Sequence, residues 1–455
     1  MLLAMAFSMT PSRLQALRGL LILALAACCA GAAQAAIPIV HWSHANGAQV
    51  YLVESPAIAM VDVQIDFDAG ARRDPQDKPG LANLMASSTA YGIKARGADA
   101  ALDENGLSDA WADLGASFGG SAGADRLSFS LRSLTYPDIL PKAVALAARQ
   151  LGDPVYPEGP WLRDRPKLAA SIKEANTRPG TMAGRAFAKL VYGPHPYGAE
   201  MTEESLGRIS VADMRSLHDQ ALRACNAKVS IVGAVSRAQA DALVGQLLAY
   251  LPRSGCGALP DVPEVAALSA PREQRIAFAS AQAHVLLGQP GIRRNSPDFF
   301  ALTVGNHILG GGGFTSRLTE EVRQKRGLTY GVYSAFAPGL HAGAFTIGLQ
   351  TRPDQAQQAL DLVREVLQRF VQEGPTEAEL QAAKDNLIGG FALRLDSNRK
   401  LLDNVANIAW NKLPLDYLDT WTARVQALTT QDIRAAFART LQPDKMVTVV
   451  LGAAQ

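Results

Sequence analysis

The chain has 455 residues, of which 48% are hydrophobic and 19% are charged, and its net charge is +2. This length is enough for two or more domains, and the composition is that of an ordinary globular protein. A charge so close to neutral, without any lysine-rich run, gives no argument for nucleic-acid binding.

The first 35 residues have the pattern of a signal peptide. Arg13 and Arg18 precede an apolar run over residues 19–30, and the A-Q-A sequence at residues 33–35 fits a cleavage site. The apolar run is too short to span a membrane as a stable helix. We therefore expect an exported, periplasmic protein. An alternative is a membrane-anchored lipoprotein, because the L-A-A-C sequence ending at Cys28 resembles a bacterial lipobox.

Two cysteines remain after this segment, Cys225 and Cys256. An even pair in an oxidising compartment is compatible with a disulfide. Two buried thiols are equally compatible with the sequence, and both interpretations stay open.

The next elements in chain order predict a sheet with helices. Residues 39–54 fit two strands joined by a turn at Asn46-Gly47, and residues 61–67 alternate as a further strand. Residues 80–88 then begin a helix. The pattern from here on recurs later in the chain.

The two halves of the chain are similar to each other. In each half a strand (residues 127–131 and 345–349) leads into an amphipathic helix (residues 139–151 and 355–371). In each half an S/T-x-x-D capping sequence, at residues 210–213 and 429–432, precedes a helix and a strand. Matched positions are separated by about 218 residues throughout, which indicates a duplicated α+β domain.

The duplication suggests the domain boundaries. We expect an N-terminal lobe over residues 36–251, a Pro- and Ala-rich linker over residues 252–274, and a C-terminal lobe over residues 275–455. The signal peptide, residues 1–35, precedes them.

Residues 309–330 contain a glycine loop, a charged helix and a strand. Gly310, Gly311, Gly312 and Gly313 have no Cβ, so another chain can approach their backbone closely. Ser316 is a candidate N-cap, Gly327 is a candidate helix stop, and residues 328–333 are the expected strand. Arg323 and Tyr330 can then converge as donors to a developing oxyanion. The alternative is a solvent-exposed helix followed by a core tyrosine.

This run resembles the C-terminal-domain signature of the pitrilysin/insulinase family of metalloproteases. Further landmarks of that family follow in the expected order at residues 67–70, 80–82, 195–198, 310–330 and 413–417. The resemblance implies two homologous lobes, each a mostly antiparallel sheet packed with helices, as in a mitochondrial-processing-peptidase-like duplication. It also implies that Arg323 and Tyr330 face a zinc site across a substrate chamber. The glycine loop, Gly310 to Gly313, would then let the substrate backbone pass close by; the alternative is that it is only the turn by which the chain enters the helix.

The zinc site of the family is absent from the sequence. Active members carry H-x-x-E-H on a helix and a downstream Glu, which supply three zinc ligands and a general base. The matching positions here are Asn83, Ala86, Ser87 and, at or near the distal ligand, Ser171. Neutral Asn and Ser are poor zinc ligands and Ala has no proton to exchange. We therefore expect no metal or other cofactor in this chain.

Some bacterial members of the family are split enzymes, and this chain resembles the subunit without zinc. The resemblance implies a heterodimer with an H-x-x-E-H subunit that carries zinc, acting on an unfolded peptide. In this hypothesis the chain is inactive alone, and Tyr330 and Arg323 stabilise the oxyanion for the partner. The alternative is a structural or peptide-binding subunit with no catalytic role.

Overall fold

The computed structural model describes residues 37–257 and 259–452. The predicted signal peptide and the lipobox cysteine Cys28 lie outside these residues. None of the helices in the described part combines the length and the apolar character that a membrane span requires.

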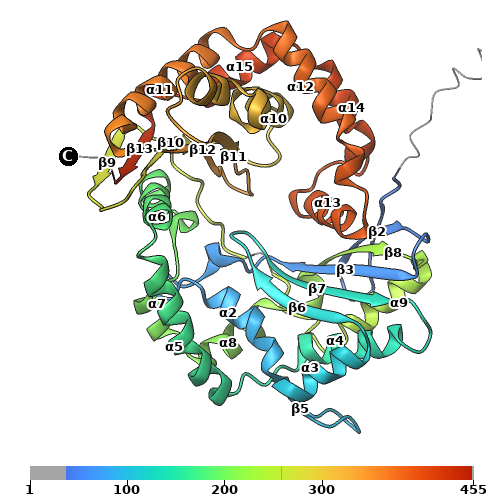
Figure 1. Ribbon diagram of the computed structural model, residues 1–455. Coiled ribbons are helices and arrows are strands. Elements are labelled where there is room, and N and C mark those ends of the chain that lie inside the picture. Colours follow the sequence, from blue (N-terminus) through green and yellow to red (C-terminus); the bar gives the residue numbers. More distant parts are fainter. Residues whose placement is uncertain (1–36, 258, 453–455) are drawn as a thin grey trace, which may run out of the picture. The chain divides into compact units, whose positions relative to one another are not determined.

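A six-stranded sheet forms from the first half of the described chain (Figure 1). Its strands are β1 (Val40–Ser43), β2 (Gln49–Glu54), β3 (Met60–Phe67), β6 (Ser117–Ala122), β7 (Leu127–Leu134) and β8 (Lys228–Gly233). Their order is β1-β2-β8-β3-β7-β6, and neighbours are antiparallel except β2 and β8. The predicted hairpin is confirmed, with Val50 opposite Trp42 and a tight turn at Gly47, whose φ is +94°.

A five-stranded sheet forms from the second half. Its strands are β9 (Arg272–Ile276), β10 (Ala283–Pro290), β11 (Val332–Phe336), β12 (Ala344–Thr351) and β13 (Val447–Leu451). Their order is β11-β12-β10-β13-β9, and the β13–β9 pair is the parallel one. Because β9 begins at Arg272, this sheet starts inside the range that the sequence predicts as linker.

The duplication and the α+β fold class are confirmed by the strand order. Read from the edge, β6-β7-β3-β8-β2 in the first sheet corresponds to β11-β12-β10-β13-β9 in the second. The matched strands β7 and β12 begin at Leu127 and Ala344, close to the predicted repeat. The strand β1 is an addition to the first sheet. A short two-stranded sheet, β4 (Gly92–Ile93) and β5 (Leu102–Asp103), lies apart from both.

Helices pack against both sheets. In the first half they are α2 (Leu81–Ser88), α3 (Glu104–Asp113), α4 (Leu140–Gly152), α5 (Glu158–Ala175), α6 (Pro179–Tyr192), α7 (Glu203–Arg208), α8 (Val211–Ala221) and α9 (Arg237–Leu247). In the second half they are α10 (Phe299–Asn306), α11 (Ala356–Glu373), α12 (Glu377–Gly389), α13 (Asn398–Asn411), α14 (Tyr417–Ala427) and α15 (Thr430–Thr440). Both predicted capping sequences form capping boxes, Ser210 with Asp213 and Thr429 with Asp432.

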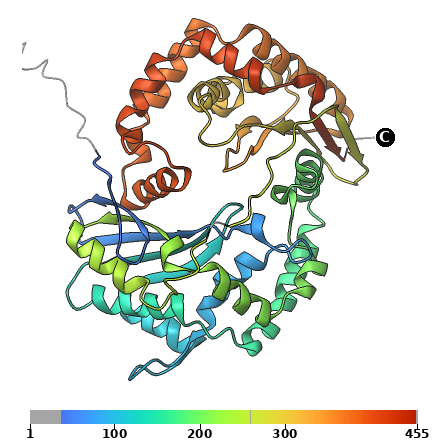
Figure 2. The ribbon, with the colours of Figure 1, turned by 180° about the vertical axis from the view of Figure 1, so that it is seen from behind.

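Two helices are exchanged between the halves (Figures 1 and 2). The helix α6 belongs to the first half but packs on β10 and β13 of the second sheet. The helix α13 belongs to the second half but packs on β2, β3 and β8 of the first sheet. Each sheet is therefore covered in part by a helix that the other half supplies.

Both exchanged contacts combine apolar packing with hydrogen bonds. Beneath α6, Phe187 and Ala183 join an apolar cluster with Val447, and Ala344 N donates to Tyr192 Oη at 2.9 Å. Beneath α13, Lys228 Nζ donates to the carbonyl oxygens of two α13 residues, Ala409 and Trp410, each at 3.2 Å. A lysine at the C-terminal end of a helix also complements the helix dipole.

A loop of the second half also binds the first half. Leu340 N donates to Asp125 Oδ2 at 2.9 Å, and His341 N donates to Tyr197 Oη at 3.2 Å. The Tyr197 hydroxyl in turn donates to Asp125 Oδ1 at 2.5 Å. The rings of His341 and His195 are 5.2 Å apart, edge to face. This junction fixes the β11–β12 loop against the first half.

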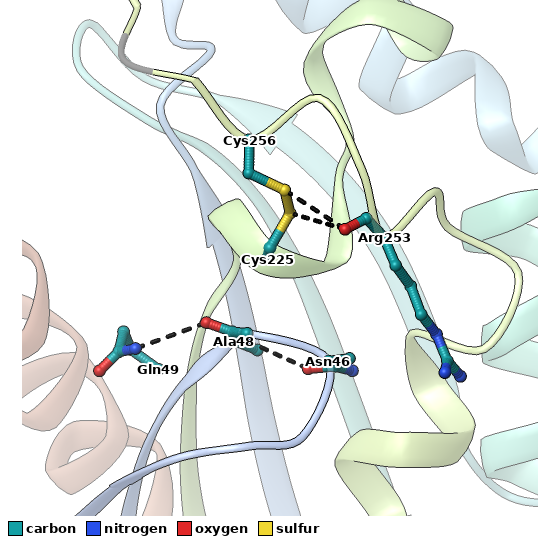
Figure 3. Close-up of a disulfide and its surroundings, with 7 residues drawn as sticks. Asn46, Ala48, Gln49, Cys225, Arg253 and Cys256 are labelled. Atoms are coloured by element: carbon teal, nitrogen blue, oxygen red, sulfur yellow. Dashed lines mark hydrogen bonds between the residues drawn. A yellow bond between two sulfur atoms is a disulfide. The ribbon is translucent and has the colours of Figure 1, made fainter.

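A disulfide joins Cys225 and Cys256, with their Cα atoms 6.1 Å apart (Figure 3). Of the two interpretations that the sequence left open, the structure therefore supports the disulfide. The Asn-Gly turn packs directly against it, since a Cβ on Gly47 would lie 2.7 Å from Cys225 Cβ. The disulfide thus ties the start of the linker to the edge of the first sheet.

Replacing both Cys225 and Cys256 by serine should lower the free energy of unfolding by about 3–4 kcal/mol. The disulfide closes a loop with a sequence separation of 31, and losing it frees that loop in the unfolded chain. Denaturant unfolding followed by circular dichroism measures the change. Reductant should weaken the wild-type chain to a similar degree and leave the double variant unaffected; equal stability of the two oxidised proteins would contradict this role.

The histidine at the junction should make stability depend on pH. His195 Nδ1 accepts from Tyr197 N at 3.1 Å and His195 Nε2 lies 3.0 Å from the Pro263 carbonyl oxygen, so the neutral ring fits both contacts. Burial and then the nearby His341 lower the pKa of His195. Its contribution is therefore complete above the usual histidine pKa of about 6.5 and is lost as the pH falls below that value.

The variant His195→Asn tests this pH dependence. Asparagine can still accept from Tyr197 N but does not titrate. Near pH 7.5 the wild-type chain should be more stable than the variant by about 1 kcal/mol, the worth of the lost contact to Pro263. This advantage should disappear near pH 5. The other charged and titratable groups around this junction are common to both proteins; they are Glu264, Asp125, His341, Arg72 and Arg293. A stability difference between the two proteins that stays constant with pH would therefore refute the role of His195.

Candidate functional site

The segment from His307 to Gln324 has unusual backbone geometry. It contains two π-helical stretches, His307–Gly311 and Thr319–Gln324, on either side of a 3₁₀ turn at Gly313–Thr315. Such wide turns are rare in proteins and are frequent at functional sites. The charged helix predicted here therefore exists, but most of it is a π-helix.

The predicted N-cap residue Ser316 is buried at the start of this helix. Its carbonyl oxygen accepts from Glu320 N at 2.9 Å, as at an N-cap. Its hydroxyl contacts Gly313 O and Thr319 Oγ1 instead of a helical N–H group. The strand predicted over residues 328–333 starts later, and covers Val332–Phe336. Gly331 N donates to the hydroxyl of Thr329, and this hydrogen bond stabilises a turn before the strand.

Three of the four loop glycines pack against their own chain. A Cβ on Gly310 would lie 2.5 Å from Ser334 N, one on Gly311 2.7 Å from Asn306 Nδ2, and one on Gly312 2.6 Å from His307 O. Gly313 has a φ of +62° and no atom near its Cβ position. The glycines therefore dock the loop onto β11 and α10, and Gly313 is the one that faces open space.

The guanidinium of Arg323 carries an uncompensated charge. The acidic residues of its helix are taken by others, since Lys325 pairs with Glu320 at 2.9 Å and Arg326 pairs with Glu321 at 2.6 Å. Among the described residues, no carboxylate lies within ion-pair distance of Arg323. It lies instead 4.7 Å from the ring centre of Phe314, a side chain that is 67% exposed. A cation held this way keeps its N–H edges available to an anion.

The side chain of Tyr330 is 85% exposed and lies in the turn before β11. Within residues 37–257 and 259–452 its hydroxyl has no hydrogen-bond partner. The structure also gives no direct contact between Tyr330 and Arg323. The two predicted donors therefore lie seven residues apart in the chain, and among the described residues neither side chain is occupied by a hydrogen-bond or ion-pair partner.

A pocket of about 410 Å³ has Gly331, the residue that directly follows Tyr330, in its wall. Its wall comes from the start of β11, from β10 and β12, and from the N-terminal turn of the exchanged helix α6. Its lining residues are Gly180, Ala183, His284, Leu286, Gly331, Val332, Tyr333, Gly348, Leu349 and Gln350. Burial lowers the pKa of His284, which favours its neutral ring. The wall is thus largely apolar and suits an uncharged side chain.

Sequence reasoning missed Phe314 and this pocket. Phe314 directly follows the four glycines, and that position was the available signal. The pocket had no sequence signal, because Gly180 and Ala183 reach the second sheet only through the helix exchange.

The positions that match the zinc site lie on α2 and α5. Asn83 and Ser87 are exposed on one face of α2, as the four-residue spacing predicts, while Ala86 is fully buried. Asn83 Oδ1 accepts from Ala122 N at 3.1 Å, and the Ser87 hydroxyl donates to Leu84 O at 3.2 Å. Ser171 is exposed on α5.

These residues do not fit a zinc ion. Within the described part of the chain, no three His, Cys, Asp or Glu side chains gather in a way that could hold a metal. Glu174, the acidic residue nearest to Ser171 in the sequence, pairs with Arg178 at 2.5 Å. Asparagine and serine hydroxyl groups do not replace imidazole and carboxylate ligands.

A protein-family model and several related proteins are similar to this chain. The model of the peptidase M16 inactive domain matches residues 208–387. An uncharacterized zinc protease of Streptomyces coelicolor is 27% identical over 307 residues, which cover 65% of this chain and 66% of that protein. The chain thus matches slightly less than two thirds of the length of this relative. A non-peptidase homolog of Helicobacter pylori is 24% identical over 397 residues, which cover 85% of this chain and 88% of that protein.

Solved structures are similar over nearly the whole described chain. A peptidase M16 inactive domain from Pseudomonas fluorescens has a TM-score of 0.85 and 35% identity, covering 92% of this chain and 98% of that one. The periplasmic protease PqqL of Escherichia coli has a TM-score of 0.78 and 17% identity, covering 92% of this chain but 46% of that one. The first likeness extends to sequence, and the second is one of fold.

Installing histidines on α2 should create a metal site on this helix. Asn83→His with Ser87→His places two imidazoles four residues apart on an exposed helix face, and such a pair binds zinc. We expect the double variant to retain zinc after gel filtration and the single variant Asn83→His to retain far less. Metal analysis of the natural chain should find less than a tenth of an equivalent; stoichiometric zinc there would mean that the site lies elsewhere.

Proposed function

Because this chain belongs to the peptidase M16 family, we propose that it is the subunit without zinc of an exported two-subunit metallopeptidase. In this proposal the partner is an H-x-x-E-H subunit of the same family, and the substrate is an unfolded peptide. The proposal depends on a contrast between two parts of this chain. Its α2 positions cannot bind zinc, while Arg323 and Tyr330 present an unpaired cation and a free phenol.

The chain's own residues would act on the transition state. The Tyr330 hydroxyl would donate to the carbonyl oxygen that gains negative charge as the scissile carbon becomes tetrahedral. Arg323, held on Phe314, would balance that charge. The zinc chemistry would belong to the partner subunit. A preorganised donor of this kind is worth about 10²–10³ in turnover.

The pocket beside Tyr330 would bind one substrate side chain. Its position next to the proposed donor, its volume of about 410 Å³ and its largely apolar wall suit an uncharged residue of an extended peptide. Gly313 would be the loop glycine near the substrate backbone, since the other three pack internally.

The proposed partner subunit is inferred from a comparison of chain lengths. The structural similarity covers 92% of this chain but only 46% of the Escherichia coli periplasmic protease. That protease is therefore long enough to contain a second unit of similar size. A peptidase whose two units are separate chains would need this chain and another. The periplasmic location of that protease also supports a periplasmic location for this chain, as does its disulfide. Cleavage within the first 35 residues would release the mature protein, whereas lipidation at Cys28 would anchor it.

A second candidate is a subunit with no catalytic share. It is favoured by the Helicobacter pylori relative, which is named a non-peptidase homolog. In that case Phe314, Arg323 and Tyr330 would bind peptide or a partner without affecting turnover.

Tyr330→Phe and Arg323→Met separate the two candidates. In a mixture with the zinc-bearing partner, Tyr330→Phe should lower kcat about 100-fold or more with little change in KM, because it removes a donor to the transition state. Arg323→Met should also lower kcat. Peptide hydrolysis measured by fluorescence at saturating partner gives both constants.

Two further variants serve as matched controls. Tyr136→Phe removes a half-exposed phenol outside both pockets, and Arg326→Met removes a cation that is already paired with Glu321. Both should leave kcat within about twofold, since surface changes of this kind seldom matter. Unchanged turnover in Tyr330→Phe and Arg323→Met would favour the non-catalytic subunit.

A further inference from the structure

A second pocket, of about 370 Å³, lies between α10, the end of β11 and the exchanged helix α13. Its lining residues are Ile292, Arg294, Phe299, Leu302, Thr303, Asn306, Phe336, Pro338 and Asn407. None of them is acidic. This pocket shares no residue with the one beside Tyr330.

The cation in this pocket lacks a counter-ion. Arg294 is half-buried, with its guanidinium carbon 3.8 Å from the ring centre of Phe299 and 5.1 Å from that of Tyr417. Arg294 Nη2 donates to the Tyr417 hydroxyl at 2.9 Å. In the described part of the chain no carboxylate lies within ion-pair distance of it, and nearby Asp298 pairs with Arg439 at 2.6 Å. Two aromatic faces therefore fix the plane of a guanidinium whose remaining N–H groups are free.

Amide groups add donors to the same pocket. Asn306 is locked by Ser334, accepting from its hydroxyl at 2.8 Å and donating to its carbonyl oxygen at 3.0 Å, which leaves one amide hydrogen over. Asn407 Oδ1 lies 3.3 Å from Asn411 Nδ2, and Asn407 Nδ2 has no partner among the described residues. Donors thus exceed acceptors around the arginine.

The remaining wall is mostly apolar. Ile292, Leu302, Phe336 and Pro338 line it together with Thr303, and the volume has room for a whole amino-acid residue. A flat guanidinium with free N–H groups binds a carboxylate through two hydrogen bonds. The ligand that matches both ends is a carboxylate attached directly to an apolar group.

We propose that this pocket binds the C-terminal residue of a peptide, with its carboxylate on Arg294 and an apolar side chain against Phe299 and Phe336. An internal Asp or Glu offers the same carboxylate but would bring a polar backbone against the apolar wall. A bound peptide end would also join α10 and β11 to α13, which packs on the first sheet. The proposal concerns binding to this chain alone and does not depend on the proposed peptidase function.

Calorimetric titration of the purified chain tests the proposal with three probes. They are acetyl-Ala-Ala-Phe with a free carboxylate, the same peptide as its C-terminal amide, and acetyl-Ala-Glu-Ala amide. The free acid should bind at least about tenfold more tightly than either amide, because they lack the carboxylate or its apolar neighbour. Equal affinity for the acid and its amide would overturn the proposal, and tighter binding of the Glu peptide would overturn the choice of a C-terminus.

Variants locate the binding in this pocket. Arg294→Gln should weaken the free acid at least about tenfold. Asn407→Asp, which keeps the acceptor for Asn411 and adds a negative charge, should weaken it as well and serves if Arg294→Gln does not fold. Arg424→Gln is the matched control, because Arg424 also lies over an aromatic ring, Phe300 at 5.5 Å, but outside the pocket. Unchanged affinity in Arg294→Gln or Asn407→Asp, or an equal loss in Arg424→Gln, would refute the site.

Discussion

Neither sheet of this chain is covered by its own half alone, because α6 and α13 are exchanged between them. The α6 contact joins Phe187 to the core beneath β13, so separating it would expose apolar surface to water. The α13 contact buries apolar side chains such as Val405 and includes Lys228, which donates to two helix carbonyl groups. The exchange therefore couples the folding of the two halves.

The same exchange positions the functional groups. Helix α6 forms one wall of the pocket beside Tyr330, and α13 contributes Asn407 to the pocket around Arg294. The segment with Arg323 is fixed separately, through the close packing of Gly310 on Ser334 of β11. The chain thus presents polar groups from its second half, while α2 of its first half has an exposed face of asparagine and serine. This combination is the basis of the proposal that this member of the peptidase M16 family works beside another subunit.

Much of the fold could be predicted from the sequence, since local patterns determine it. The repeat of about 218 residues, the Asn46-Gly47 turn and the two capping boxes each depend on neighbouring residues, and each was found where expected. The loss of the zinc ligands was equally local. The partners of α6 and α13 could not be predicted, because an amphipathic helix encodes an apolar face but not the sheet that will cover it. For the same reason neither pocket could be predicted from the sequence. The sequence also could not show that Arg323 and Arg294 lack ion-pair partners, because this depends on which carboxylates pair with other cations in the folded chain. The π-helical turns could not be predicted either, because residue propensities describe α-helices and do not distinguish π-helices from them.

We propose that this chain completes a peptidase that it cannot form alone. The most direct measurement is hydrolysis of an unfolded peptide by a purified H-x-x-E-H relative from the same organism, as this chain is titrated into it. We expect no turnover from this chain alone and a saturable rise in turnover as the two chains are mixed. Turnover by this chain alone, or a rate that stays unchanged at every ratio of the two chains, would refute the two-subunit proposal.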